Sequence, residues 1–184
     1  MPLSKPVRRQ HLHTREILCR GFKREDGLWD IEAKLADTKT YAFDNADRGG
    51  ISAGEPVHAM AVRLTVDDAL VVRDIEVSSD SAPFSICGGA TDGYRALKGL
   101  SIGRGWKKTV IGLVGAIKGC THITDLIVGP LAVAAFHTVH SAREKLGQPG
   151  EDGKTRPALI DSCHAFAGDS PVVKRRWPAF YTGK

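Results

Sequence analysis

The chain has 184 residues, of which 42% are hydrophobic and 26% are charged, a balance typical of one soluble globular domain. No apolar run reaches the roughly 18 residues of a membrane span, and no apolar segment follows the basic start, so we expect a cytoplasmic protein without a secretory signal. The net charge of +5 comes mainly from lysines and arginines near the two ends, which favours solvated tails over nucleic-acid binding.

Four apolar runs after a basic arm at residues 1–13 predict an antiparallel sheet. "TREILCRGFKRE" and "LWDIEAKLADTKTYAF" flank Asp26-Gly27, a dipeptide typical of tight hairpin turns. In "VHAMAVRLTVDD" apolar and polar residues alternate, and this alternation places His58 and Met60 on the apolar face. The fourth run, residues 70–79, follows closely enough to form another hairpin. We expect residues 14–184 to form a single domain.

The pattern changes from strand to helix after "PFSICGG". We expect helices at residues 91–100, 106–117 and about 121–146, the last one kinked or restarted at Pro130, and at most one short turn of helix near the C-terminus. Strands first and helices later indicate the α+β class: a mostly antiparallel sheet packed against helices, with an N-terminal β-hairpin added to the core.

The stretch "AIKGCTHITDLI" contains the most suggestive candidate site. Cys120 and His122 lie at the start of the third predicted helix, with Thr121 as the expected N-cap. The positive end of a helix dipole favours the thiolate form of a nearby cysteine. Because the four cysteines are widely spaced and no export signal is present, we expect free, ligating or catalytic thiols rather than disulfides.

A metal site is the alternative interpretation of the same residues. Cys87 lies at a strand-to-helix junction before two glycines, and His58 lies at the inner edge of a strand. Together with Cys120 and His122, they would supply a Cys₂His₂ zinc set. A buried cysteine or an inward histidine is more often a core residue, so this set depends on the fold bringing all four together.

Several segments resemble a bacterial family of domains of unknown function across residues 14–180. They are "DGLWDIEAKLAD", "AGEPVHAMAVRLTVD", "PFSIC", "LKGL", "GCTHITDL" and "DSCHAF", with the DGLWD and GCTH signatures the most specific. Residues 54–146 are also similar, at greater distance, to the iron–sulfur cluster assembly scaffolds of the NifU N-terminal type. That resemblance implies a core with three ligand positions, which correspond here to His58, Cys87 and Cys120. Met60 replaces the scaffold's aspartate, so the cluster-building set is incomplete.

Two functions follow from these residues. The first is a small-molecule enzyme of the lyase, isomerase or hydrolase type, in which His58 and His122 transfer protons and Cys120 is a candidate nucleophile. Its substrate would be anionic and could carry an aromatic ring; the residues expected to bind it are Tyr94, Arg95, Arg104 and Trp106. No nucleotide-binding or nicotinamide-binding motif is present. The second is a zinc- or iron–sulfur-related binding module without catalysis. Either function is compatible with a homo-oligomer.

Overall fold

The computed structural model describes residues 2–145, 154–157 and 159–183, with side chains described up to residue 142 in the first range. The chain divides into two compact units, Met1–Ser141 and Ala142–Lys184. Residues 2–12 are exposed and precede the first strand, and the basic arm expected over residues 1–13 stays a prediction. The expectation of a single domain over residues 14–184 stays a prediction.

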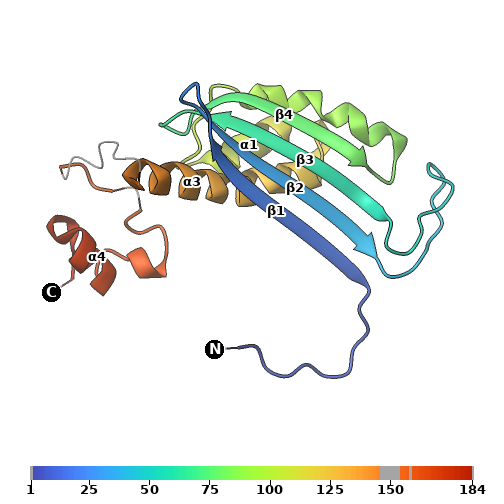
Figure 1. Cartoon of the computed structure of the whole chain (residues 1–184), viewed down its shortest axis with the longest axis horizontal. Coiled ribbons are helices and arrows are strands. Elements are labelled where there is room, and N and C mark those ends of the chain that lie inside the picture. Colours follow the sequence, from blue (N-terminus) through green and yellow to red (C-terminus); the bar gives the residue numbers. More distant parts are fainter. Residues whose placement is uncertain (1, 146–153, 158, 184) are drawn as a thin grey trace. The chain divides into compact units, whose positions relative to one another are not determined.

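A four-stranded antiparallel sheet forms one layer of the first unit (Figure 1). Its strands are β1 (His13–Lys23), β2 (Trp29–Lys39), β3 (Pro56–Val66) and β4 (Val72–Ser81), and they lie side by side in chain order. The hairpin turn between β1 and β2 contains Gly27, whose φ of 87° is a left-handed conformation that glycine adopts without strain. The predicted strands and the predicted hairpin are therefore confirmed.

Helices cover one face of this sheet, which makes the first unit an α+β fold (Figure 1). Two 3₁₀ helices come first, η1 (Ser85–Ala90) and η2 (Asp92–Leu97). They are followed by α1 (Trp106–Val114) and the 3₁₀ turn η3 (Ala116–Lys118), which ends just before the candidate site. The first expected helix, at residues 91–100, is thus a 3₁₀ helix.

The last helical segment runs from Thr121 without a break. It consists of α2 (Thr121–Leu126), the π-helical turn η4 (Ile127–Leu131) and α3 (Ala132–Lys145). The irregularity expected at Pro130 takes the form of this π-turn, because a widened turn tolerates a residue that has no backbone N–H.

The core lies between the helices and the inner face of the sheet. In β2 the residues Trp29, Ile31, Ala33 and Leu35 are at most 2% exposed, whereas the residues between them are more exposed. Helical residues of the first unit complete the core; the fully buried ones are Leu97, Val110, Ile123, Leu126, Ile127, Leu131, Ala135 and Val139. This burial is the expected consequence of period-two and helical patterning on facing layers.

The stretch Thr121–Ala142 is long and apolar enough, by length and composition alone, to cross a membrane. The core helix of a soluble protein passes the same test, and Ile123, Leu126 and Leu131 are fully buried in the first unit. The expectation of a protein without a membrane span stays a prediction.

The second unit contains one short α-helix, α4 (Pro171–Arg176), and the 3₁₀ turns η5 (His164–Phe166) and η6 (Pro178–Phe180). Ser170 caps α4, because its hydroxyl accepts a hydrogen bond of 3.2 Å from the backbone N–H of Val173. The described part of this unit therefore has somewhat more helix than the sequence predicted.

Candidate functional site

Three polar residues form a row across the inner face of the sheet at one end of the strands. Asp37 continues the buried face of β2 by one more alternation after Leu35. In the register of the sheet, Asp37 lies opposite Arg15 on β1 and opposite His58 on β3. Directly opposite residues in an antiparallel pair point to the same face and have adjacent side chains. The register thus brings a guanidinium, a carboxylate and an imidazole together.

Asp37 is the centre of this row and is only 2% exposed. Arg15 binds it with two parallel hydrogen bonds, from Nε to Oδ1 and from Nη2 to Oδ2, both 2.7 Å long. The Nδ1 atom of His58 lies 3.1 Å from Oδ2, and the Nε2 atom of His13 lies 3.2 Å from Oδ1. Burial alone would raise the pKa of Asp37, but the hydrogen bonds and charge of Arg15 outweigh burial and lower it. The carboxylate is therefore ionised at neutral pH.

The start of α2 adds a second imidazole above the row. The rings of His58 and His122 pack with centroids 3.9 Å apart and planes tilted by 33°, and Nε2 of His122 lies 3.8 Å from Asp37 Oδ2. The side chains of His58 and His122 are 16% and 27% exposed, so a solute can reach both rings.

Both imidazoles are held in an environment that disfavours their charged form. Burial lowers the pKa of His58, the charge of His122 lowers it further, and Asp37 opposes both effects. Burial also lowers the pKa of His122, and the neighbouring Arg15 charge acts in the same direction. Neutral imidazoles can accept a proton at pH 7, which is the state required of a general base.

Cys120 joins the group through His122. Its Sγ lies 3.8 Å from His122 Nδ1 and 3.9 Å from the sulfur of Met60. His122 thus contacts both His58 and Cys120. We call Arg15, Asp37, His58, Cys120 and His122 the imidazole cluster.

The N-cap of α2 is Cys120, whereas the sequence analysis expected Thr121. Cys120 has an extended backbone with φ −97° and ψ 129°, and its carbonyl accepts a hydrogen bond of 2.9 Å from Thr124 N–H. Thr121 is therefore the first residue inside the helix.

A buried tyrosine fixes the backbone at Cys120. The hydroxyl of Tyr94 accepts a 2.9 Å hydrogen bond from Cys120 N–H, donates to Cys120 C=O over 2.8 Å and lies 2.9 Å from Thr124 Oγ1. Gly119 permits this approach, because a Cβ there would lie 2.4 Å from Val114 O and 2.8 Å from the tyrosine hydroxyl. The sequence predicts that Tyr94 binds the substrate, but Tyr94 is 1% exposed, so it positions Cys120 and is not available to stack on a substrate.

The other predicted substrate residues lie outside the imidazole cluster. Arg95 is exposed on η2, with Nη2 3.5 Å from Asp92 Oδ1, and Arg104 is exposed in the turn before α1. Trp106 is 5% exposed, and its Nε1 donates to Ile127 C=O over 3.1 Å.

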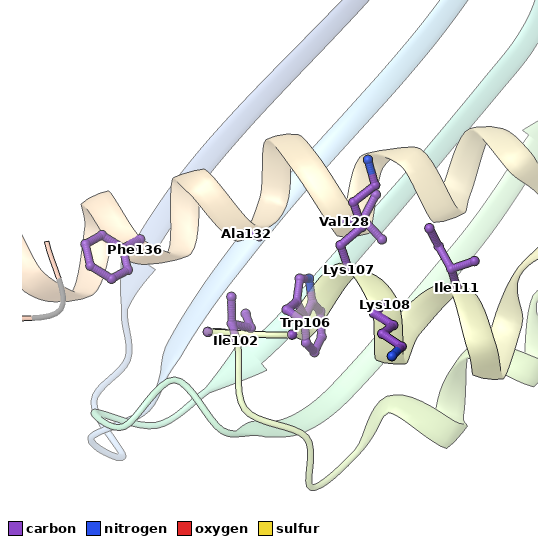
Figure 2. A pocket seen from close by; sticks show the side chains of 10 residues that line it. Ile102, Trp106, Lys107, Lys108, Ile111, Val128, Ala132 and Phe136 are labelled. Atoms are coloured by element: carbon purple, nitrogen blue, oxygen red, sulfur yellow. The ribbon is translucent and has the colours of Figure 1, made fainter. Parts of the chain in front are cut away.

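Trp106 lines a separate open groove of about 650 Å³ beside α1 and the long helix, and no residue of the imidazole cluster lines this groove (Figure 2). Its labelled lining is mainly apolar, with Ile102, Val128 and Phe136 along it and Lys107 and Lys108 on α1.

The three side chains that could hold a metal ion differ from the predicted set. Among the described residues, the candidate ligand atoms of Asp37, His58 and His122 all lie within 4.8 Å of one another. Both predicted histidines belong to this group, whereas Cys87, on η1, and Cys120 do not. A carboxylate thus takes the place of the two expected thiolates.

Sequence reasoning missed Asp37 and Arg15. The signal for Asp37 was present, because the alternation from Trp29 to Leu35 places the residue two positions later on the same buried face. A carboxylate on an otherwise apolar strand face needs a partner, and the hairpin register offers Arg15 as that partner.

A family model matches most of the first unit. The family model "Protein of unknown function (DUF2889)" matches residues 13–137, which include all four strands and the complete imidazole cluster. The chain belongs to this family. Neither the curated proteins nor the solved structures include a match to the chain, so the likeness to the iron–sulfur assembly scaffolds stays a prediction.

Proposed function

We propose that this protein is a small-molecule enzyme that carries out acid–base chemistry at the imidazole cluster. The observation that carries the proposal is the 3.1 Å contact between Asp37 Oδ2 and His58 Nδ1, beneath a second imidazole 3.9 Å away. A carboxylate that accepts from Nδ1–H holds the ring in one orientation and leaves Nε2 with its lone pair. His58 is then the general base.

His122 suits the complementary role of proton donor in the state in which it, and not His58, carries a proton on both ring nitrogens. Two packed imidazoles resist carrying two positive charges at once, because like charges a few ångströms apart repel. A proton on one ring therefore favours a neutral second ring. Proton removal at one substrate atom and proton delivery at another are the two steps that an isomerase or a lyase needs.

Arg15 supports an anionic substrate in place of the arginines that the sequence suggested. Its side chain is 36% exposed beside the imidazoles, and Nε and Nη2 are used by Asp37. Its Nη1 makes no hydrogen bond within the described residues and can donate to a substrate carboxylate. The aromatic part of the predicted substrate loses its support, because Tyr94 and Trp106 are buried.

Cys120 adds a hydrolase variant of the same proposal. Its thiol proton would pass to His122 Nδ1, the thiolate would add to a substrate carbonyl carbon, and the leaving group would depart with that proton. Water would then hydrolyse the resulting thioester and regenerate the thiol. The present S–N distance of 3.8 Å must shorten for this transfer, as catalytic contacts often do once substrate is bound.

A divalent metal bound by Asp37, His58 and His122 is the second candidate. Zinc bonds of about 2.0–2.1 Å place tetrahedral ligand atoms roughly 3.3 Å apart. The separations of 3.1 Å and 3.8 Å from Asp37 Oδ2 to the two histidines are close to that value. Two histidines and one carboxylate also leave positions open for a substrate.

Arg15 supports acid–base chemistry over the metal candidate. Its guanidinium already occupies both oxygens of Asp37, and a fixed positive charge there opposes a second cation on the same carboxylate. An iron–sulfur cluster has less support still, because it needs thiolates and the group of three contains none.

The test is proton exchange with a panel of small 2-oxo and 2-hydroxy carboxylic acids and their thioesters in D₂O, followed by NMR. We expect exchange or turnover that falls about 100-fold or more in His58→Gln, persists in His137→Gln on the exposed part of α3, and is unchanged by EDTA. Activity that EDTA abolishes and zinc restores would favour the metal candidate. Activity that survives in His58→Gln would contradict both the acid–base candidate and the metal candidate, because each uses His58.

A further inference from the structure

The outer edge of β1 is an 11-residue strand edge that the first unit leaves unpaired. In the sheet order, β1 and β4 are the two edge strands, and β1 is drawn in blue in Figure 1. The segment after β4 partly protects that strand, since Gly99 N–H and Leu100 C=O bond the backbone of Val72. Within the described residues, no backbone bond joins the outer edge of β1 to another segment.

Large apolar side chains are exposed along this same strand. Ile17, Leu18 and Phe22 are 42%, 51% and 45% exposed. Long apolar edge strands are templates for pairing with another strand, and proteins usually shorten them, charge them or cover them. The edge of β1 is neither short nor interrupted by proline, and its charges are of both signs, so a second strand could pair with it.

The sequence of β1 is complementary to itself in one antiparallel register. Leu18 is the midpoint of His13–Lys23, so a two-fold axis at Leu18 pairs the strand with a second copy over its full length. That register places Leu18 opposite Leu18, Ile17 opposite Cys19, and Glu16 opposite Arg20 at two symmetric positions. Opposite charges on directly facing residues stabilise a pair of strands, and the same register extends the apolar contact at its centre.

Registers shifted by two residues keep the same faces of the strands together but pair less favourable side chains. A shift by two residues in one direction places Arg15 opposite Lys23, and a shift in the other direction places Glu16 opposite Leu18. The register centred on Leu18 also places Gly21 opposite Arg15, so no side chain of the partner strand faces Arg15 directly.

We propose that two copies of this chain associate through their β1 strands, antiparallel and centred on Leu18, to form one continuous eight-stranded sheet. The partner strand is β1 of a second copy, because the residues of β1 are complementary to those of β1 itself. This inference is independent of the chemistry proposed for the imidazole cluster.

Charge variants test the register. In Glu16→Arg the introduced arginine faces Arg20 of the other copy, and in Arg20→Glu the introduced glutamate faces Glu16, so each variant alone should be monomeric. An equimolar mixture should form a one-to-one heterodimer, because each arginine then meets a glutamate. The wild-type chain should have twice the 19.8 kDa mass of one chain in multi-angle light scattering at submillimolar concentration.

Asp80→Arg is the matched control, since it makes the same charge change on an exposed residue of the opposite edge strand and should stay dimeric. Circular dichroism checks the fold of each variant. Arg20→Glu places a glutamate beside Glu32 on β2 and could misfold for that reason. Leu18→Lys is the second variant: it places two lysines opposite each other in the dimer and should also give monomers. A monomeric wild type, dimers that persist in Glu16→Arg and Leu18→Lys, or a mixture without heterodimer would overturn the proposal.

Discussion

At the scale of single residues, Asp37 explains why the imidazole cluster exists. It is an ionised carboxylate on an otherwise apolar strand face, and three basic side chains from β1 and β3 satisfy it. A buried charge is tolerated only when it is paired and hydrogen-bonded. The burial of Asp37 therefore requires these partners beside it.

Replacement of Asp37 by asparagine should destabilise the fold. The amide keeps the size of the side chain but loses the charge that Arg15 binds with two bonds, and hydrogen bonds to charged groups contribute about 1.5–3 kcal/mol. We expect the free energy of unfolding in urea to fall by about 2–3 kcal/mol. The exposed Asp80→Asn should change it by less than about 0.5 kcal/mol. Equal effects of the two variants would show that Asp37 is not held as described.

Tyr94→Phe tests the support of the Cys120 backbone. Loss of the hydroxyl leaves the partly buried Cys120 N–H without its partner, which costs about 1–3 kcal/mol of unfolding free energy. Thermal unfolding measures this loss, with Tyr41→Phe at an exposed ring as the neutral comparison. A melting temperature equal to that of the wild type would argue against the role assigned to Tyr94.

At the level of elements, the sheet and the helix α3 approach each other closely at Gly21 on β1. A Cβ built there would lie 1.9 Å from Thr138 Oγ1 and 2.6 Å from Thr138 Cβ on α3. Because neither a strand nor a helix can move without disturbing other core contacts, the glycine sets the distance between β1 and α3.

Two glycine-to-alanine variants should therefore have opposite effects. Gly21→Ala should lower the free energy of unfolding by about 1–3 kcal/mol through overpacking. Gly112→Ala, in α1 where nothing lies within 4 Å of the added Cβ, should raise it by up to about 1 kcal/mol through helix propensity. Chemical denaturation of both variants checks the signs, and a stabilised Gly21→Ala would contradict the packing described.

The elements were largely predictable from the sequence, because half-buried antiparallel strands have a period of two and Asp26-Gly27 marks the hairpin. The imidazole cluster was predictable only in part. His58, Cys120 and His122 stood out as reactive residue types, but the position of Asp37 beside Arg15 depends on strand register. Aromatic residues are ambiguous for a different reason. Tyr94 and Trp106 could equally line a pocket or fill the core, and only the packed structure distinguishes these outcomes.

At the scale of the whole molecule, the imidazole cluster links stability to pH. The pKa values of His58 and His122 are lowered below the ordinary value of 6.5, so near that pH the unfolded chain binds more protons than the folded chain. Their contribution to stability is present above pH 6.5 and is lost as the pH falls toward their lowered folded-state pKa values.

The melting temperature should therefore fall as the pH is lowered from 8 toward 5, and His58→Gln should reduce this dependence because glutamine does not titrate. His137→Gln, at an exposed position on α3, should leave the dependence unchanged. A melting temperature that stays constant or rises on acidification would contradict the environment described for the two imidazoles.

An NMR pH titration of the histidine ring nitrogens and carbons, in the wild type and in Asp37→Asn, tests the pairing of His58 with Asp37. We expect a neutral His58 protonated on Nδ1, pKa values below 6.5 for His58 and His122, and a further decrease in the pKa of His58 in Asp37→Asn, because the carboxylate charge raises that pKa. A His58 that carries its proton on Nε2 and titrates at or above 6.5, with no response to Asp37→Asn, would contradict that pairing.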